Sequence, residues 1–280
     1  MTRSVHDRSG KIIAQLAHAG LYADANLTGQ PPLAPSSVRD LTETVPEEMR
    51  TVDIQETIDA FAAAASRAKS AGFDGVQIHI AHGYLLSQFL SPRFNQRSDA
   101  YGGNTENRIR IVLEVLGAIR KQVGSDYPVL VKMNTGDYLD GGLELVDAVQ
   151  IGLMLESAGI DAIELSGGTG ASGKLRPVRT GIKSEEQEAY FEAAAKAFRE
   201  QIRVPLMLVG GIRSYAVARR IVSQNIADCI SMSRPFIREP DLINRWKAGD
   251  RSRATCLSDN RCFVPIRKGE GVYCVTAKRH

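Results

Sequence analysis

The sequence has no long apolar run and little net charge. None of its hydrophobic stretches approaches the roughly 18 residues that a membrane helix needs, and the first ten residues, MTRSVHDRSG, lack the apolar centre of a signal peptide. The 35 Lys and Arg are intermixed with 32 Asp and Glu, which leaves a formal charge of +3. The chain therefore offers no basic footprint for nucleic acid or a membrane surface. We expect a cytoplasmic protein, and a small anionic ligand is compatible with this balance.

Cysteine is also scarce. The chain has only four, Cys229, Cys256, Cys262 and Cys274, which are too few for a disulfide framework in 280 residues. Three of them lie near the C-terminus. We expect residues 1–250 to form one domain and residues 251–280 to form a cysteine-containing extension.

What the chain does have is an alternation of short apolar strands and amphipathic helices. Strands are predicted at residues 11–16, 75–80, 128–133, 161–166, 205–209 and 228–232, and helices at 52–71, 105–123, 144–158, 184–201, 214–223 and 241–248. Residues 21–50 are predicted to be irregular, and residues 85–103 to form a polar loop with one helical turn. This alternation is typical of parallel βαβ units.

The predicted fold class is α/β, an incomplete TIM-type (β/α)8 barrel with about six βα units. A closed barrel needs eight strands, and the chain begins almost at once with a strand, so two N-terminal units are expected to be missing. An open doubly wound sheet is the alternative. It has less support, because no Gly-rich dinucleotide fingerprint opens the chain.

Polar side chains gather after the strand at 75–80, in the stretch DGVQIHIAHGY. His79 and His82 can converge only if the chain leaves the extended conformation between them, and Gly83 permits such a turn. Two neutral imidazoles can donate hydrogen bonds to one carbonyl or phenolate oxygen, and Tyr84 can donate a proton. The alternative is one buried structural histidine, one exposed histidine and a structural tyrosine. A metal site is less favoured, since no third ligand stands at suitable spacing.

Charged and glycine-rich positions follow the other strands. Lys132 interrupts a buried strand, where its ammonium needs a partner or a ligand, or else reaches solvent on its long stem. Gln15 could add amide hydrogen bonds at the same face. Gly210-Gly211 and Ser233-Arg234 follow the last two strands, where barrels bind phosphate. A Gly-Gly pair is equally typical of an ordinary tight turn.

Several segments together resemble the old yellow enzyme family of FMN-dependent ene-reductases. They are QLAHAG (15–20), AGFDGVQIHIAHGYLLSQFLSPRFNQRSDAYGGNTENR (71–108), PVLVKMN (128–134), LVGGI (208–212) and ADCISMSRPFIREPDL (227–242). They occur in the family's order through nearly the whole chain, matching from the third barrel strand onward. The resemblance implies a TIM barrel carrying FMN, which takes hydride from NADH or NADPH and passes it to an activated C=C bond.

The resemblance also implies roles for individual residues. His79 and His82 would bind the substrate oxygen, and Tyr84 would donate the proton. Gln15 and Lys132 would contact the pyrimidine side of the flavin, with Lys132 standing where many relatives have arginine. The FMN phosphate would be held by a set drawn from the last two loops: Gly210, Gly211, Ser233 and Arg234. Ser233 stands where glycine is usual, which is acceptable if its backbone angle is an ordinary one.

The sequence departs from the family at both ends. The family's first two barrel strands have no counterpart before Lys11, so two parallel-sheet edges would be exposed. We expect either a truncated form of a longer protein or a chain completed by a partner, for which a homo-oligomer is one route. Some larger relatives hold an iron–sulfur cluster on four C-terminal cysteines, but Asp259 occupies the position of the second cysteine here. We therefore expect free structural cysteines and no cluster, and none of the flavin and nicotinamide domains that larger relatives append.

The leading hypothesis is an FMN-dependent NAD(P)H oxidoreductase that acts on an α,β-unsaturated carbonyl or a similar activated alkene. One alternative is a truncated or inactive barrel subunit with no catalysis of its own. Another is a flavin-free, phosphate-binding barrel isomerase or aldolase, in which Lys132 could form a Schiff base. That alternative leaves the paired histidines unexplained.

Overall fold

The fold is built on one parallel sheet of six strands. The computed structural model describes residues 1–38 and 44–277. The strands occur in the spatial order β1-β4-β5-β6-β7-β8, which is also their order along the chain. Their bounds are β1 Ile13–Leu16, β4 Gly75–Ile80, β5 Val129–Asn134, β6 Ala162–Ser166, β7 Leu206–Leu208 and β8 Cys229–Ile230. All six predicted strands are confirmed, and sequential parallel neighbours are the arrangement that repeated βα units produce.

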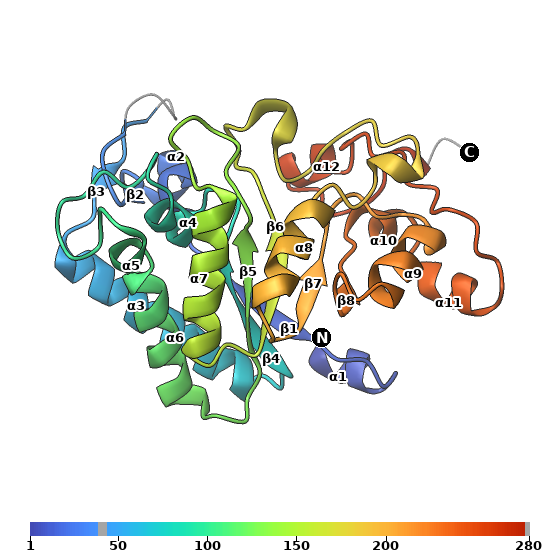
Figure 1. Ribbon diagram of the computed structural model, residues 1–280, viewed down its shortest axis with the longest axis horizontal. Coiled ribbons are helices and arrows are strands. Elements are labelled where there is room, and N and C mark those ends of the chain that lie inside the picture. Colours follow the sequence, from blue (N-terminus) through green and yellow to red (C-terminus); the bar gives the residue numbers. More distant parts are fainter. Residues whose placement is uncertain (39–43, 278–280) are drawn as a thin grey trace.

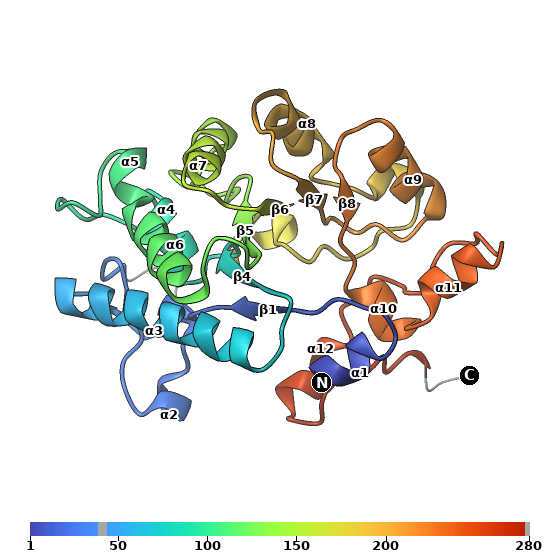
Figure 2. The ribbon, with the colours of Figure 1, turned by 90° about the horizontal axis from the view of Figure 1, so that it is seen from below.

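Five helices cover the outer face of this sheet. They are α3 Thr51–Ser70, α6 Arg110–Val123, α7 Leu145–Ser157, α8 Glu192–Gln201 and α9 Tyr215–Ser223. Figure 2 shows the strands as an arc with these helices outside it and α10 Arg234–Arg238 and α12 Phe263–Arg267 on the opposite side. Val76, Ile78 and Ile80 belong to the core cluster with these helices, so the alternate residues Gln77 and His79 face inward.

Short elements occupy the connections (Figure 1). The helices are α1 Thr2–His6, α2 Ala25–Thr28, α4 Leu85–Leu90, α5 Thr105–Arg108 and α11 Leu242–Lys247, and three 3-10 turns cover Gly20–Tyr22, Gly173–Leu175 and Glu185–Gln187. A second, two-stranded sheet pairs β2 Leu33–Ala34 with β3 Glu47–Glu48 inside the predicted irregular segment. Residues 39–43 of that segment and residues 278–280 of the extension lie outside the described residues.

Two predicted segments differ from the structure. The segment after the histidine cluster does contain a short helix, α4, but this part is not a polar loop, because every residue in α4 is buried. The helix predicted at 184–201 begins only at Glu192. Ala189 adopts a left-handed φ of 51°, which a continuous helix cannot contain. The buried Glu188 side chain accepts hydrogen bonds from the backbone N–H groups of Arg213 and Ser214 at 2.8 and 2.9 Å, which holds the chain in this turn.

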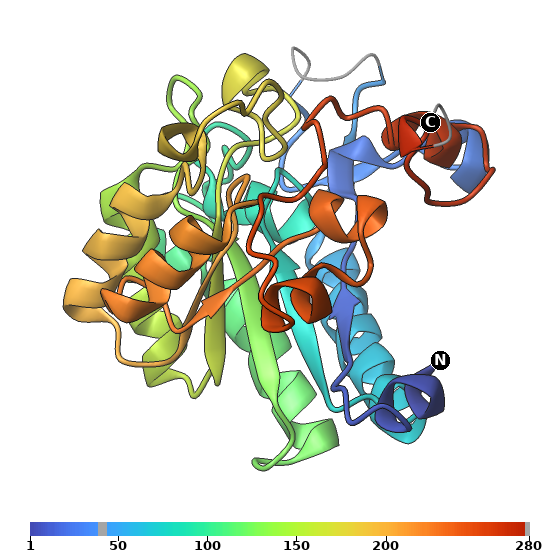
Figure 3. The same cartoon turned by 90° about the vertical axis from the view of Figure 1, so that its right-hand side faces the viewer.

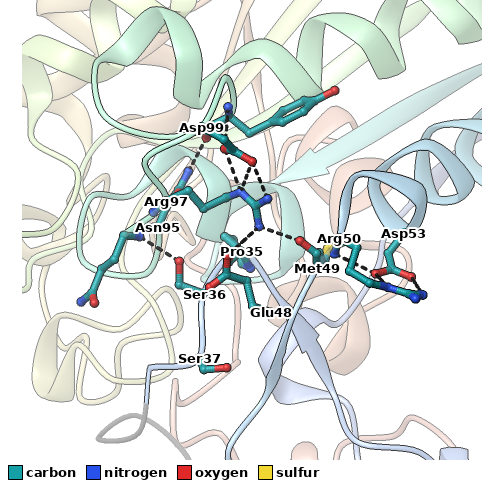
Figure 4. A network of polar contacts seen from close by, with 12 residues as sticks. Pro35, Ser36, Ser37, Glu48, Met49, Arg50, Asp53, Asn95, Arg97 and Asp99 are labelled. Carbon is teal, nitrogen blue, oxygen red and sulfur yellow. Dashed lines mark hydrogen bonds and ion pairs between the residues drawn. The ribbon is translucent and has the colours of Figure 1, made fainter.

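Arg97 ties the N-terminal excursion to the loop that follows α4 (Figure 4). Its Nη1 donates to the carbonyl oxygens of Pro35 at 2.9 Å and Met49 at 2.7 Å. Its Nη2 donates to Asp99 at 2.6 Å, and this ion pair compensates the charge of an arginine whose side chain is only 6% exposed. The short β2–β3 sheet is therefore fastened to the loop that follows α4, the helix that begins directly after Tyr84.

The sheet does not close into a barrel within residues 1–38 and 44–277. There, β1 and β8 each pair with only one strand, as the predicted strand count implies. Figure 3 views the molecule from this open side, where the segment after β8 crosses in front of the sheet. No helix in the described part of the chain has both the length and the apolar character needed to cross a membrane.

Candidate active site

His79, His82 and Tyr84 come together just beyond the carboxyl end of β4. The strand ends at Ile80, and the chain then turns through left-handed conformations at His82, with φ of 65°, and Gly83, with φ of 78°. This turn brings the ring centroids of His79 and His82 to 4.9 Å and those of His79 and Tyr84 to 5.1 Å. A non-glycine residue in this conformation is uncommon and is maintained by surrounding contacts.

Neighbouring strands hold His82 in place. Its backbone N–H donates to Oδ1 of Asn134 at 3.0 Å, and its Nε2 lies 2.8 Å from the hydroxyl oxygen of Ser166. Asn134 ends β5 and Ser166 ends β6, so both partners come from the same edge of the sheet. Nδ1 of His79 is buried and has no hydrogen-bond partner among the described residues. A buried, unpartnered ring nitrogen is what a bound oxygen would satisfy.

Both imidazoles are neutral at neutral pH. Burial lowers the pKa of His79 to about 4, and the nearby Lys132 ammonium adds to this effect while Glu164 opposes it. Burial also holds the pKa of His82 well below its usual value, with the charges of His79 and Lys132 contributing. Each neutral ring carries one N–H donor. The pair can therefore donate hydrogen bonds to an oxygen that gains negative charge during a reaction.

A chain of polar side chains crosses the inner face of the sheet below the histidines. The Gln15 amide donates to Gln77 at 2.7 Å, and the Gln77 amide donates to Oε2 of Glu164 at 2.9 Å. Nζ of Lys132 donates to Oε1 of the same carboxylate at 2.9 Å. The side chains of Lys132 and Glu164 are only 15% and 10% exposed, so each charge compensates the other in a poorly solvated place.

Sequence reasoning selected Gln15 and Lys132 but missed Gln77 and Glu164. A signal was present, because each of these four strands carries a polar residue within an otherwise apolar run. The strand register shows why they meet: Gln15 lies opposite Gln77, and Lys132 lies opposite both His79 and Glu164. Residues at matching heights on parallel neighbours share one face.

The two predicted phosphate loops meet at one cavity of about 260 Å³, which Gly211, Ser233 and Arg234 line. Gly210 and Gly211 have φ of 144° and 74°, and a Cβ on Gly211 would lie 2.8 Å from a ring carbon of Tyr190. Both positions therefore require glycine. Ser233 has a negative φ of −122°, outside the left-handed region that favours glycine.

Two arginines, Arg213 and Arg234, line this cavity, and no Asp or Glu does. Nη1 of Arg234 donates to the Arg179 carbonyl oxygen at 2.9 Å and to Oδ1 of Asn260 at 2.7 Å. Nε of Arg179 and Nε of Arg213 are buried without a partner among the described residues. Burial lowers the pKa of Arg213, and the charge of Arg253 adds to this effect. Orphan cationic donors around a glycine turn fit a phosphate group, and sequence reasoning missed Arg179, Arg213 and Asn260.

A second cavity, of about 630 Å³, opens beside the histidine cluster. We call it the Tyr84 cavity, and it is lined by Tyr22, His82, Tyr84, Gly170, Arg176, Pro177, Val178, Asn260, Phe263, Val264 and Arg267. The rings of Tyr22 and Tyr84 meet edge to face with centroids 6.3 Å apart. Three of the lining residues come from α12 of the C-terminal extension. No feature of the sequence pointed to their place beside the histidines.

The C-terminal cysteines do not assemble a metal site in the described residues. All four cysteines of the chain are free, with Cys256 and Cys262 buried and Cys274 half-buried. Among residues 1–38 and 44–277, no group of three or more His, Cys, Asp or Glu side chains is placed to hold a metal ion. The Asp259 carboxylate instead accepts hydrogen bonds from the Arg261 N–H and the Thr276 hydroxyl. This set of side chains does not fit an iron–sulfur cluster. The absence of a cluster stays a prediction.

Comparisons with known proteins match this architecture. The family model described as "NADH:flavin oxidoreductase / NADH oxidase family" matches residues 1–252. The NADH oxidase of Thermoanaerobacter brockii is 34% identical over 293 residues, covering 98% of this chain and 44% of the relative. The chain thus spans less than half the length of that curated relative.

Two solved structures extend the likeness to three dimensions. A 2-naphthoyl-CoA reductase in complex with 2-naphthoyl-CoA has a TM-score of 0.88 at 26% identity, covering 99% of this chain and 44% of the other. An old yellow enzyme homologue from Zymomonas mobilis has a TM-score of 0.74 at 27% identity, covering 92% and 72%. The predicted resemblance to old yellow enzymes, with their barrel-type α/β fold, is confirmed. The chain belongs to the NADH:flavin oxidoreductase / NADH oxidase family.

Proposed function

We propose that the chain is an FMN-dependent oxidoreductase that transfers hydride from NADH or NADPH to the C=C bond of an α,β-unsaturated carbonyl or a related electron-poor alkene. FMN, when bound, supplies the hydride transfer that no side chain can perform. Membership of the family supports this cofactor and this type of reductant. The observation that carries the proposal is the pair of neutral imidazoles beside Tyr84.

The imidazole pair binds the substrate's carbonyl oxygen in this proposal. His79 and His82 donate N–H hydrogen bonds to the oxygen, and the oxygen satisfies the orphan nitrogen of His79. Their withdrawal of electron density makes the far carbon of the alkene a better hydride acceptor. Tyr84, whose ring lies beside that of His79, donates its phenolic proton to the other alkene carbon. Burial keeps the imidazoles neutral across the physiological pH range, so each ring presents one N–H donor.

The cofactor residues follow from the two polar systems below and beside this pair. Gln15 and Lys132 would contact the pyrimidine side of the flavin, and Glu164 holds the Lys132 ammonium in place. Gly210, Gly211, Ser233 and Arg234 would bind the phosphate; the last three line the cavity, and the orphan Nε groups of neighbouring arginines add positive charge. The contact of Lys132 with the Glu164 carboxylate counts against a Schiff-base role, because its Nζ is already engaged in that ion pair.

The same proposal covers the organisation of the chain. Residues 1–250 form the FMN-binding barrel domain, and residues 251–280 form an extension whose α12 lines the Tyr84 cavity. The substrate is a small molecule. A cytoplasmic location and a homo-oligomeric state stay predictions.

The test uses the FMN-loaded chain and a phenol that mimics the substrate oxygen. A phenolate bound by the two histidines against the flavin gives a long-wavelength charge-transfer absorption band. We expect the band with 4-chlorophenol in the original chain and its loss in the double variant His79→Ala/His82→Ala, which retains FMN. His6→Ala is the matched control, since it removes an imidazole at the other end of the sheet that pairs with Asp74. A band that persists in the double variant refutes the role of the two histidines.

A further inference from the structure

The Tyr84 cavity has an unbalanced charge. Arg176 and Arg267 line it, and no Asp or Glu side chain does. Arg176 lies in the segment after β6 and Arg267 in the last turn of α12, two segments that Figure 1 shows beside each other at the carboxyl end of the sheet. Segments nearly a hundred residues apart in sequence thus bring two guanidinium groups to one opening. The remaining lining is largely aromatic or aliphatic.

Neither guanidinium has a carboxylate partner among the described residues. Nε of Arg176 donates to the Gly173 carbonyl oxygen at 2.8 Å, which leaves its other donors available. Both Arg176 and Arg267 are exposed, whereas six less exposed arginines of the described residues are engaged with carboxylates. These six are Arg97, Arg108, Arg120, Arg199, Arg220 and Arg245. A guanidinium carries its N–H donors in a planar fork. When no carboxylate occupies that fork, it is suited to a bidentate contact with a phosphate group.

We propose that Arg176 and Arg267 bind a phosphate group of the molecule that enters the Tyr84 cavity. This inference rests on the proposed function, because it places the reacting end of that molecule at His82 and Tyr84. Two molecules can bring a phosphate there. One is the dinucleotide reductant with its diphosphate, and the other is an alkene substrate joined to a phosphate-bearing carrier. The shared chemistry is a phosphate oxyanion held at the rim while an apolar group occupies the interior.

Three ligands separate the two sources. Kinetics of the FMN-loaded chain are measured with NADH, with 2-butenoyl-CoA as a phosphate-bearing alkene, and with 2-cyclohexen-1-one as a neutral alkene. The variants are Arg176→Gln, Arg267→Gln and their double. The control double variant Arg203→Gln/Arg219→Gln removes the same charge from two exposed arginines that do not line the cavity.

We expect each single variant to raise the Kd or KM of a phosphate-bearing ligand roughly fivefold, and the double variant roughly 25-fold if the two effects add. The KM for the neutral alkene should change less than about twofold in these variants, and so should every constant measured for the control variant. A raised constant for NADH alone identifies the reductant as the source of the phosphate group. A raised constant for 2-butenoyl-CoA alone identifies the alkene substrate as that source. The effect should shrink as salt is added. Unchanged constants for both phosphate ligands, or an equal loss for 2-cyclohexen-1-one, would overturn the proposal.

A second measurement separates this inference from the proposed function. Calorimetric titration with coenzyme A and with NAD⁺ reports phosphate binding without any turnover. If no alkene is reduced but these ligands bind and the double variant weakens them, the proposed function fails while the phosphate site stands. If alkenes are reduced and neither ligand depends on the two arginines, the phosphate site fails alone.

Discussion

Replacing Glu164 by Gln removes the charge that compensates Lys132 inside the sheet. The two charged atoms are 2.9 Å apart, and their side chains are 10% and 15% exposed. At an effective dielectric constant of about 20 the gross attraction is about 6 kcal/mol. Breaking one side of such a pair costs about 3–5 kcal/mol. We expect about 3 kcal/mol, because the Lys132 ammonium keeps some contact with water.

The assay is urea unfolding followed by far-UV circular dichroism, at matched protein concentration. A loss of about 3 kcal/mol should appear as a lower midpoint, and as a melting temperature lower by roughly 6 °C at this chain length. The double variant Lys132→Met/Glu164→Gln should recover part of the loss, since no buried charge is left unpaired. Lys196→Met is the control, because its ion pair with Glu192 has the same 2.9 Å separation but a lysine that is 57% exposed. A cost below about 1 kcal/mol for Glu164→Gln, or no recovery in the double variant, would refute the reasoning.

Three further changes test other parts of the site. Tyr84→Phe should slow alkene reduction at least roughly tenfold while leaving flavin reduction by NAD(P)H unchanged, as measured by stopped-flow absorbance; equal slowing of both steps would contradict a proton-donor role. The pKa of His79 is lowered to about 4 in the folded chain, so the unfolded chain binds this proton more readily. The free energy of unfolding should therefore fall as pH drops from about 6.5 to about 4, by up to about 3 kcal/mol. In His79→Gln that part of the acid sensitivity should be absent from unfolding curves measured at several pH values. Gly211→Ala should weaken FMN binding at least roughly tenfold in a fluorescence titration, because a Cβ would lie 2.8 Å from Tyr190, whereas Gly159→Ala, also at positive φ but with open space, should not.

The strands could be predicted because each carries its own signal. Apolar, β-branched runs bounded by glycine, proline or charged residues identified all six, and β4 Gly75–Ile80 matches the predicted range. The burial of helix α4 could not be found this way. Its six residues, LLSQFL, include Ser87 and Gln88, which look polar in sequence but are buried because the Gln88 amide donates to the Gly83 carbonyl oxygen at 2.6 Å. Tertiary hydrogen bonds of this kind leave no local pattern.

The histidine cluster was accessible to sequence reasoning because its residues are close in the chain. His79, His82 and Tyr84 need only one turn to meet. Lys132 was recognised as a charge that needs compensation, but its partner is 32 residues away on the next strand. The register that pairs Lys132 with Glu164 is set by the packing of whole βα units, which pattern reasoning does not supply.

The C-terminal extension was the largest gap in the predicted site. Its cysteine spacing directed attention to a metal centre, whereas the structure uses Asn260 as a partner of Arg234 and α12 as a wall of the Tyr84 cavity. Asn260 has a left-handed φ of 58°, a conformation that asparagine tolerates better than most residues. Neither contact could be inferred from spacing, because both join segments that are distant in sequence.

The most direct test of the central claim follows flavin absorbance in one anaerobic experiment. The chain is mixed with FMN, freed of unbound flavin, reduced with NADH or NADPH, and then mixed with 2-cyclohexen-1-one. The account predicts about one bound FMN per chain, bleaching of its absorbance by the reductant, and recovery of that absorbance as one alkene is reduced per flavin. A chain that binds no FMN, or a reduced flavin that the alkene does not reoxidise, would contradict it.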